Sequence, residues 1–403
     1  MEAPARTRPL LGWAVVAVLF LATTCVESMS WTQLGAFTPL YLRELGVPSA
    51  DVPRWVAAMS SLGWFVALPL APFWGVWADR YSRKAVIVRS AVMEAVIFAA
   101  WAFASSPEMA LLFRCLNGLV LGNTGVMLAV QSSVTPKERL GLAIGVVGAG
   151  SQVGRAVGPA LGALLIHLVD VRGMLLFDAG LSIGMAVLLT FAIREPEREK
   201  PSGVSVLNLL RAAFGEIAGH PLIWRMFVAL TLAQVGTWIV FPYLPIYIGS
   251  LAGSIPAPTA VGLVLSGTGI AAAVASPLWG RVVDRVGHVR LLSVTSVLTA
   301  AGMAAAGFAP TLGLMAAALL CFSLFSVAFG VANMALLAVS VSPERRGAVL
   351  GQVLFPFYVS GLIGPLIGGA IFGAGRQAVM LAAAAVTLTP LVLLASAPRA
   401  QAR

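Results

Sequence analysis

Apolar runs of roughly 20 residues follow one another along nearly the whole chain, about twelve in all. A helix rises about 1.5 Å per residue, so each run is long enough to cross the hydrocarbon core of a bilayer. The runs do not alternate between apolar and polar residues as barrel strands do, and only helices and closed barrels satisfy their backbone within lipid. The sequence, 59% hydrophobic and 10% charged, therefore predicts an all-α integral membrane protein.

Charge clusters and Pro or Gly residues separate the runs and set the boundaries of the predicted transmembrane helices. The first run follows Arg6 and Arg8 as in a secretory signal, but the Ala-Thr-Thr before Cys25 is a poor cleavage site, so we interpret this run as an uncleaved first span. The expected spans are 11–42, 54–76, 85–105, 108–131, 139–168, 172–193, 222–248, 258–280, 289–309, 312–339, 347–373 and 376–396.

The basic residues are distributed unevenly between the two sides of the membrane. With an even number of spans, both termini lie on one side. Of the 26 basic residues, 20 fall on that side, and four fall on the other, namely Arg43, Arg54, Arg172 and Arg376. Because cytoplasmic loops are enriched in basic residues, we expect both termini in the cytoplasm. The same bias explains the net charge of +10 without a nucleic-acid partner.

The two halves of the chain are repeats of each other. Gly158-Pro159 recurs as Gly364-Pro365, and PLYL at 39–42 recurs as PIYI at 245–248, each after 206 residues. Six spans per half return each copy to the same side, which predicts parallel repeats related by an axis along the membrane normal. The expected organisation is an N-terminal six-helix bundle over 1–193, a cytoplasmic linker with a short amphipathic helix over 194–221, and a C-terminal six-helix bundle over 222–403.

The loop between the second and third spans reads GVWADRYSRK, and the matching loop of the second half reads GRVVDRVGHVR. The first resembles the signature loop G-x-x-x-D-R-x-x-R-[RK] of the major facilitator superfamily, and the second is a weaker copy, with His288 at a usually basic position. With the twelve spans and the central loop, this resemblance covers essentially the whole chain. It implies the major facilitator fold and a gate at the cytoplasmic face, formed by Gly75, Asp79, Arg80, Arg83, Gly280, Asp284 and Arg285.

The fifth predicted span contains GAGSQVGRAVGPALGAL, in which glycines recur at every fourth position. They share one helix face, against which a second helix can pack backbone to backbone. The pattern resembles the family's antiporter motif G-x-x-x-G-P-x-x-G-G, with Ala163 in place of the last glycine, and the family uses this motif mostly in exporters. The matching residues are Gly150, Gly154, Gly158, Pro159 and Gly162.

Isolated charges inside a membrane are costly and mark functional sites by default. Here they are Glu27, Glu94, Arg114, Arg155 and Asp178. A shift of 206 residues places Ala233, Leu320, Gly361 and Ala384 opposite four of them, so the fold does not require the charges. The segment RCLNGLVLGN around Arg114 is similar to the family's fourth-span motif R-x-x-x-G-x-x-x-[GA], whose arginine the family links to proton coupling.

We expect proton coupling from Glu27, Arg114, Asp178 and Arg155, whose depths in the bundle allow ion pairs among them. Glu27 is the predicted proton carrier. An apolar cavity favours the protonated form of a carboxyl group, and a nearby arginine favours the ionised form. Glu94 is interpreted as a structural partner to a neighbouring helix.

The resemblance implies that substrate contacts the first, fourth, seventh and tenth spans. Aromatic and hydrogen-bonding side chains in these spans suit amphipathic ligands. The candidates are Trp31, Gln33, Phe37, Asn117, Asn123, Gln234, Trp238, Phe241, Tyr243 and Asn333.

These features predict a proton-coupled exporter of small amphipathic compounds in a bacterial cytoplasmic membrane, similar to the drug:proton antiporter branch. Two alternatives remain open: a proton symporter that takes up a sugar or organic anion, and a lipid or glycolipid flippase. An enzyme is disfavoured, since the three histidines lie near no nucleophile motif and the chain has no phosphate-binding loop and no cluster of metal ligands. We expect no cofactor and no metal, and a working monomer.

Overall fold

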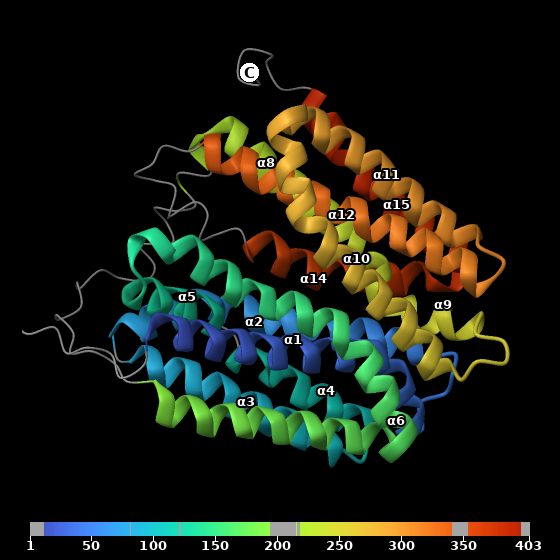
Figure 1. Cartoon of the computed structure of the whole chain (residues 1–403). Coiled ribbons are helices and arrows are strands. Elements are labelled where there is room, and N and C mark those ends of the chain that lie inside the picture. Colours follow the sequence, from blue (N-terminus) through green and yellow to red (C-terminus); the bar gives the residue numbers. More distant parts are fainter. Residues whose placement is uncertain are drawn as a thin grey trace, which may run out of the picture.

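The computed structural model describes residues 12–80, 82–120, 122–193, 215, 218–340 and 354–395, and within them the chain forms helices joined by short turns (Figure 1). The N-terminal half consists of α1 (Trp13–Glu44), α2 (Val52–Arg80), α3 (Arg83–Ala102), α4 (Pro107–Cys115), η1 (Leu116–Leu119), α5 (Asn123–Val134), η2 (Lys137–Arg139) and α6 (Leu140–Ala192). The C-terminal half consists of α8 (Pro221–Val240), η3 (Phe241–Tyr243), α9 (Leu244–Ser250), α10 (Ala257–Val286), α11 (His288–Phe308), α12 (Leu312–Ser340), α14 (Leu354–Ile371), η4 (Phe372–Ala374) and α15 (Arg376–Ala395).

Nine stretches of the described residues are long and apolar enough to cross a membrane. One of them, Lys137–Ala192, has 56 residues and turns back at Asp170, whose backbone is in the left-handed region at φ 83°. The Asp170 Oδ1 accepts a hydrogen bond from the backbone N–H of Gly173 at 2.7 Å, as an N-cap does. The label α6 therefore covers two spans. Together with α2 and the run α4–η1–α5, these stretches make the twelve transmembrane helices that the sequence predicts.

Local signals explain where helices begin. The Ser82 hydroxyl accepts a hydrogen bond from the Ala85 N–H at 2.9 Å and caps α3. The Ser106 hydroxyl accepts one from Met109 at 3.2 Å and caps α4, which has proline at its first position. The first residues of the predicted span 347–373 lie outside the described part of the chain. Most of the predicted linker 194–221 also lies outside it, so the division into two bundles joined by this linker stays a prediction.

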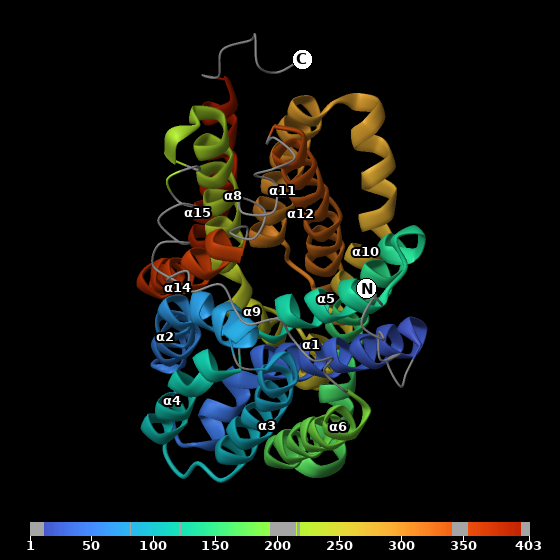
Figure 2. The ribbon, with the colours of Figure 1, turned by 90° about the vertical axis from the view of Figure 1, so that its left-hand side faces the viewer.

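We call the end of the bundle that carries Trp13 and Ala395 the proximal end, and the end that carries the α1–α2 and α9–α10 turns the distal end. A single core of buried apolar residues joins both halves, with Leu42 and Val240 among its members. Two smaller cores are each confined to one half: one around Phe20 in the N-terminal half and one around Met226 in the C-terminal half. The halves therefore meet toward the distal end and diverge toward the proximal end (Figures 1 and 2).

Two helix pairs hold the halves together: α10 packs on the first part of α6, and α14 packs on α2. A Cβ atom on Gly262 of α10 would lie 2.7 Å from the Ala163 Cβ, and one on Gly269 would lie 2.8 Å from the Ala156 Cα. Between them, the Ser266 hydroxyl accepts a hydrogen bond from the Ala160 N–H at 2.9 Å. Glycine at these positions allows the two backbones to touch.

Replacing Gly269 with valine is expected to push α10 away from α6 and open the distal end. Forcing side-chain atoms into a packed contact costs about 1–3 kcal/mol, which shifts a two-state equilibrium roughly fivefold to 150-fold. Spin labels on the exposed turn residues Ser49 and Ser254, in a variant without Cys25, Cys115 and Cys321, measure the distal separation.

The matched control is Gly267→Val on the same helix, where the nearest atom to an added Cβ is the Leu320 Cδ2 at 3.8 Å. A longer label distance in Gly269→Val and an unchanged one in Gly267→Val are expected. Equal distance distributions in both variants contradict the role of this contact.

Candidate functional site

The fourth span is broken, where the sequence predicts one continuous helix over 108–131. The helix α4 ends at Cys115, the 3-10 turn η1 follows, and α5 starts at Asn123. Gly122 has φ 96°, which a side chain disfavours, and a Cβ on Gly118 would lie 2.8 Å from the Leu70 Cδ1. The break therefore brings this span close to α2 and separates Arg114, which precedes it, from Asn123, which follows it.

Glu27 and Asn123 form the first part of the site. The Asn123 Nδ2 donates a hydrogen bond to the Glu27 Oε2 at 2.9 Å, which joins α1 to α5. Glu27 is half-buried and lies 14 residues into α1, about 21 Å along the helix. A partly accessible carboxyl group at this depth can exchange a proton or contact a cationic group.

Arg114 is bound by residues other than Glu27 and Asn123. Its Nε donates a hydrogen bond to the Met59 backbone oxygen at 3.1 Å, and its guanidinium lies over the Trp31 ring at 5.1 Å and the Trp101 ring at 6.0 Å. This arrangement ties the fourth span to α2 through the backbone and to α1 and α3 through aromatic faces.

No ion pair joins Glu27, Arg114, Arg155 and Asp178 to one another in this conformation, and their role in proton coupling stays a prediction. The estimate from helical rise fixed their depth but not the face of the helix on which each lies.

Asp178 and Glu94 lie inside the N-terminal half. Asp178 is completely buried beside Ser30, and Glu94 is 4% exposed beside Ser182. Both carboxyl groups thus lie among α1, α3 and α6, and Glu94 is close enough to interact electrostatically with both Asp178 and Glu27.

An aromatic cluster closes the space between the halves. Trp64 of α2 stacks on Tyr358 of α14 at 5.4 Å and meets Phe357 and Trp238 edge-on at 5.3 Å and 5.7 Å. Trp238 in turn contacts Phe241 at 5.6 Å. We call these five residues the aromatic cluster; its rings could stack on an apolar or aromatic compound.

The sequence missed three members of this cluster, Trp64, Phe357 and Tyr358. Their signal was aromatic residues in the middle of the second and eleventh spans, far from the interfacial positions that anchoring aromatics occupy. They lie outside the first, fourth, seventh and tenth spans, which the family resemblance assigns to the substrate.

The predicted substrate residues divide by burial. Trp31, Gln234 and Trp238 are half-buried, and Phe241 is 40% exposed. The side chain of Asn117 lies outside the described part of the chain, and Asn123 contacts Glu27.

Five of the predicted substrate residues are buried in this conformation, namely Gln33, Phe37, Asn123, Tyr243 and Asn333. Phe37 fills the space beside Gly162, the Tyr243 hydroxyl donates to the Pro365 oxygen at 2.5 Å, and the Asn333 Nδ2 donates to the Met226 oxygen at 3.5 Å. They face neighbouring helices, which a list of residue types cannot reveal.

The glycines of the predicted antiporter motif form the contact between α6 and α1. A Cβ on Gly154 would lie 2.8 Å from the Met29 backbone nitrogen, one on Gly158 would lie 2.7 Å from the Met29 oxygen, and one on Gly162 would lie 2.7 Å from the Phe37 ring. Gly150 approaches the Leu21 backbone, and Pro159 faces Gly262 of α10. The motif thus fixes α1, and with it Glu27, against α6.

The second half repeats this arrangement. A Cβ on Gly364 of α14 would lie 2.5 Å from the Trp238 Cβ, and one on Gly368 would meet the Tyr243 ring at 2.6 Å. The glycines of α14 therefore fix α8 as those of α6 fix α1.

The predicted gate residues lie at the proximal end. The side chains of Gly75, Asp79, Arg80 and Asp284 are outside the described part of the structure. Arg83 is the first residue of α3, Arg285 is exposed in the last turn of α10, and a Cβ on Gly280 would meet no atom within 4 Å. The gating role stays a prediction.

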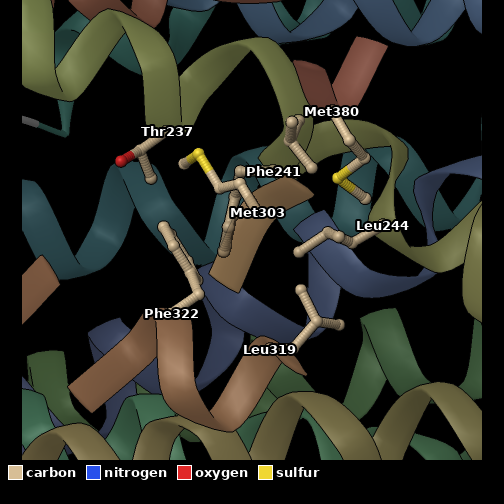
Figure 3. A pocket seen from close by; sticks show the side chains of 8 residues that line it. Thr237, Phe241, Leu244, Met303, Leu319, Phe322 and Met380 are labelled. Atoms are coloured by element: carbon tan, nitrogen blue, oxygen red, sulfur yellow. The ribbon is translucent and has the colours of Figure 1, made fainter. Parts of the chain in front are cut away.

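A small apolar pocket lies within the C-terminal half, between α8, α11, α12 and α15 (Figure 3). The side chains of Met303 and Met380, which carry sulfur atoms, are among those that line it, and Thr237 is the lining residue with a polar side chain. Phe241 belongs both to this pocket and to the aromatic cluster. The cavity of about 10 Å³ has room for no more than about one water molecule, so it holds no part of a compound in this conformation.

A family model described as Major Facilitator Superfamily matches residues 19–255 and 253–403. Multidrug resistance protein MdtG of Citrobacter koseri is 27% identical over 358 residues, covering 87% of each chain. MdtG of Yersinia enterocolitica is 31% identical over 264 residues, covering 64% of this chain and 62% of the relative. The uncharacterized MFS-type transporter YuxJ of Bacillus subtilis is 26% identical over 353 residues, covering 85% of this chain and 88% of YuxJ.

Solved structures share the fold. The nucleoside transporter NupG superposes with a TM-score of 0.77 at 15% identity, covering 95% of this chain and 98% of NupG. A bacterial homologue of the human lysosomal transporter Spinster, in an inward-facing and occupied conformation, gives a TM-score of 0.76 at 15% identity and covers 98% of this chain and 96% of the homologue. With two six-helix halves that the family model spans almost completely, the chain belongs to the Major Facilitator Superfamily.

Proposed function

We propose that this transporter exports small amphipathic compounds in exchange for protons, across the cytoplasmic membrane of a bacterium. The observation that carries the proposal is the membrane-embedded Glu27, bound to Asn123 and partly accessible. Several relatives that match most of the chain are named multidrug resistance proteins, which supports export of drug-like compounds.

Alternating access supplies the transport step. The basic residues favour a cytoplasmic location for the proximal end, so the conformation described here, joined at the distal end, faces the cytoplasm. A compound that enters between the halves would contact the aromatic cluster and displace the proton of Glu27. After the halves rock toward the outside, protonation of Glu27 from the external solution would release the compound.

The gate loops complete the cycle. When the distal contacts between α10 and α6 separate, the last turns of α2 and α10, which contain Gly75 and Gly280, would close the proximal end. Arg114, bound to the Met59 backbone, would hold the broken fourth span in place while Glu27 changes its charge. We propose that a single chain carries out this cycle.

The test uses the purified full-length protein in liposomes with a pH dye in the lumen. Adding an amphipathic compound such as a cationic xanthene dye is expected to release protons into the compartment from which the compound is taken up. Proton and compound moving in the same direction would establish a symporter instead. Lipid translocation without any compound-dependent proton movement would establish a flippase.

A further inference from the structure

Arg155 lies on α6 between the face that packs on α1 and the face that packs on α10. On α6, successive residues are about 100° apart around the helix. Gly154 and Gly158 face α1, and Ala156 and Pro159 face α10. Arg155 lies between these two contact faces, and about 200° away from Val153 and Val157, which are 47% and 46% exposed on the outer surface of the bundle.

The face that carries Arg155 is open toward the proximal end. Gly141 and Gly148 precede Arg155 by 14 and 7 residues and therefore lie nearly below it on the helix. A Cβ at either glycine would meet no atom within 4 Å, and both positions are exposed. Gln152, one turn below Arg155, is also exposed.

Above Arg155 the same face is closed. Gly162, seven residues further on, is buried, and a Cβ there would lie 2.7 Å from the Phe37 ring and 3.1 Å from the Gln33 Cγ. Arg155 therefore lies where this face of α6 changes from uncovered on its proximal side to closely packed on its distal side.

The guanidinium of Arg155 has no partner in the described part of the chain. It is an exposed side chain in the middle of a membrane helix, and it makes no hydrogen bond or ion pair there. Its counterpart in the other half, Gly361, packs against Trp64, so the repeated fold does not need a cation at this position. Intramembrane arginines without a structural partner commonly serve a ligand or an ion.

Arg155 is level with Glu27 but separate from it. The neighbouring Gly154 meets α1 at Cys25, Ser28 and Met29, the turn that contains Glu27. Glu27 lies about 200° around α1 from Cys25, and it contacts Asn123 on α5. A negative and a positive group thus lie at one depth on two sides of α1.

We propose that Arg155 binds an anionic oxygen group, such as a carboxylate, on the transported compound. The proposal rests on the proposed function and deepens it: the substrates are amphipathic compounds that carry an oxyanion, including zwitterions whose cationic end lies near Glu27. The planar guanidinium can form two parallel hydrogen bonds to such a group. This binding role takes the place of the proton-coupling role that the sequence predicts for Arg155.

The test compares two probes that differ in one charge, the ester rhodamine 6G and its free carboxylic acid. Binding to the full-length protein in lipid nanodiscs is followed by fluorescence anisotropy. The ratio of the affinity for the acid to the affinity for the ester is expected to be about tenfold higher in the wild type than in Arg155→Gln. This is the factor expected for one charge-assisted hydrogen bond. Arg155→Lys, which keeps the charge, should recover part of this ratio.

An acid-to-ester affinity ratio that is the same in wild type and Arg155→Gln overturns the proposal. If Arg155→Gln does not fold, the wild type decides alone, because equal affinity for the acid and the ester also overturns it. Transport in liposomes separates this failure from that of the proposed function. If the wild type exchanges the ester for protons and does not distinguish the acid from the ester, only the role of Arg155 is refuted. If it exchanges neither probe for protons, the antiporter function is refuted.

Discussion

Replacing Glu27 with glutamine is expected to reduce compound-driven proton movement by at least roughly tenfold in liposomes with a lumenal pH dye. Glutamine has nearly the same shape and can still accept the hydrogen bond from Asn123, but its amide does not take up or release a proton in the physiological pH range. Binding of the compound should therefore persist while the proton flux is lost. Fluorescence anisotropy on the same preparation checks that binding.

The matched control is Glu94→Gln, which removes a different carboxyl group of the N-terminal helices, one that is 4% exposed. Its proton flux per folded transporter should stay within about twofold of wild type. A Glu27→Gln variant that exchanges protons normally would remove Glu27 from the mechanism and make Asp178 or Glu94 the next carrier to test.

Replacing Gly154 with valine is expected to lower the thermal unfolding midpoint by roughly 5 °C or more, or to prevent folding. The first atom of the new side chain would lie 2.8 Å from the Met29 nitrogen and 3.0 Å from the Ser28 Cβ, and it would also meet the Cys25 oxygen. Backbone atoms cannot move aside without shifting α1. The expected cost is about 3 kcal/mol, the upper end of the usual range for overpacking. Differential scanning fluorimetry in detergent measures it.

Gly148→Val provides the comparison on the same helix. An added Cβ there would meet nothing within 4 Å, so the midpoint should change by less than roughly 2 °C. If Gly154→Val and Gly148→Val unfold at the same temperature, the glycine face of α6 is not a close contact with α1.

The number, length and order of the transmembrane helices could be predicted because hydrophobic length is a local property of the chain. The predicted span 289–309 and the helix α11 (His288–Phe308) differ by one residue at each end. The repeat was visible because two copies of one bundle need glycine at the same places, such as Gly158 and Gly364, where a neighbouring helix comes close.

The details of the site depend on helix rotation, which apolar sequence barely specifies. When nearly every face of a helix is hydrophobic, periodicity does not tell which side faces a partner. Gln33 and Phe37 were therefore expected at the substrate and are buried against α6, whereas Trp64 was overlooked and forms the centre of the aromatic cluster. The break at Gly122 was also hidden, because one glycine in a long apolar run does not by itself end a helix.

All the charges that lie deep in the membrane belong to the N-terminal half, namely Glu27, Glu94, Arg114, Arg155 and Asp178, whereas the C-terminal spans carry charged residues only near their ends, as Arg376 does. Moving one elementary charge across a membrane potential of 100 mV changes its free energy by about 2.3 kcal/mol. The membrane voltage therefore acts on the charges of the N-terminal half and of the transported compound, and the C-terminal half carries no charge deep enough to respond to it. One proton exchanged for a zwitterion moves one net charge per cycle and draws on the voltage, while one exchanged for a monovalent cation moves none and runs on the pH gradient alone.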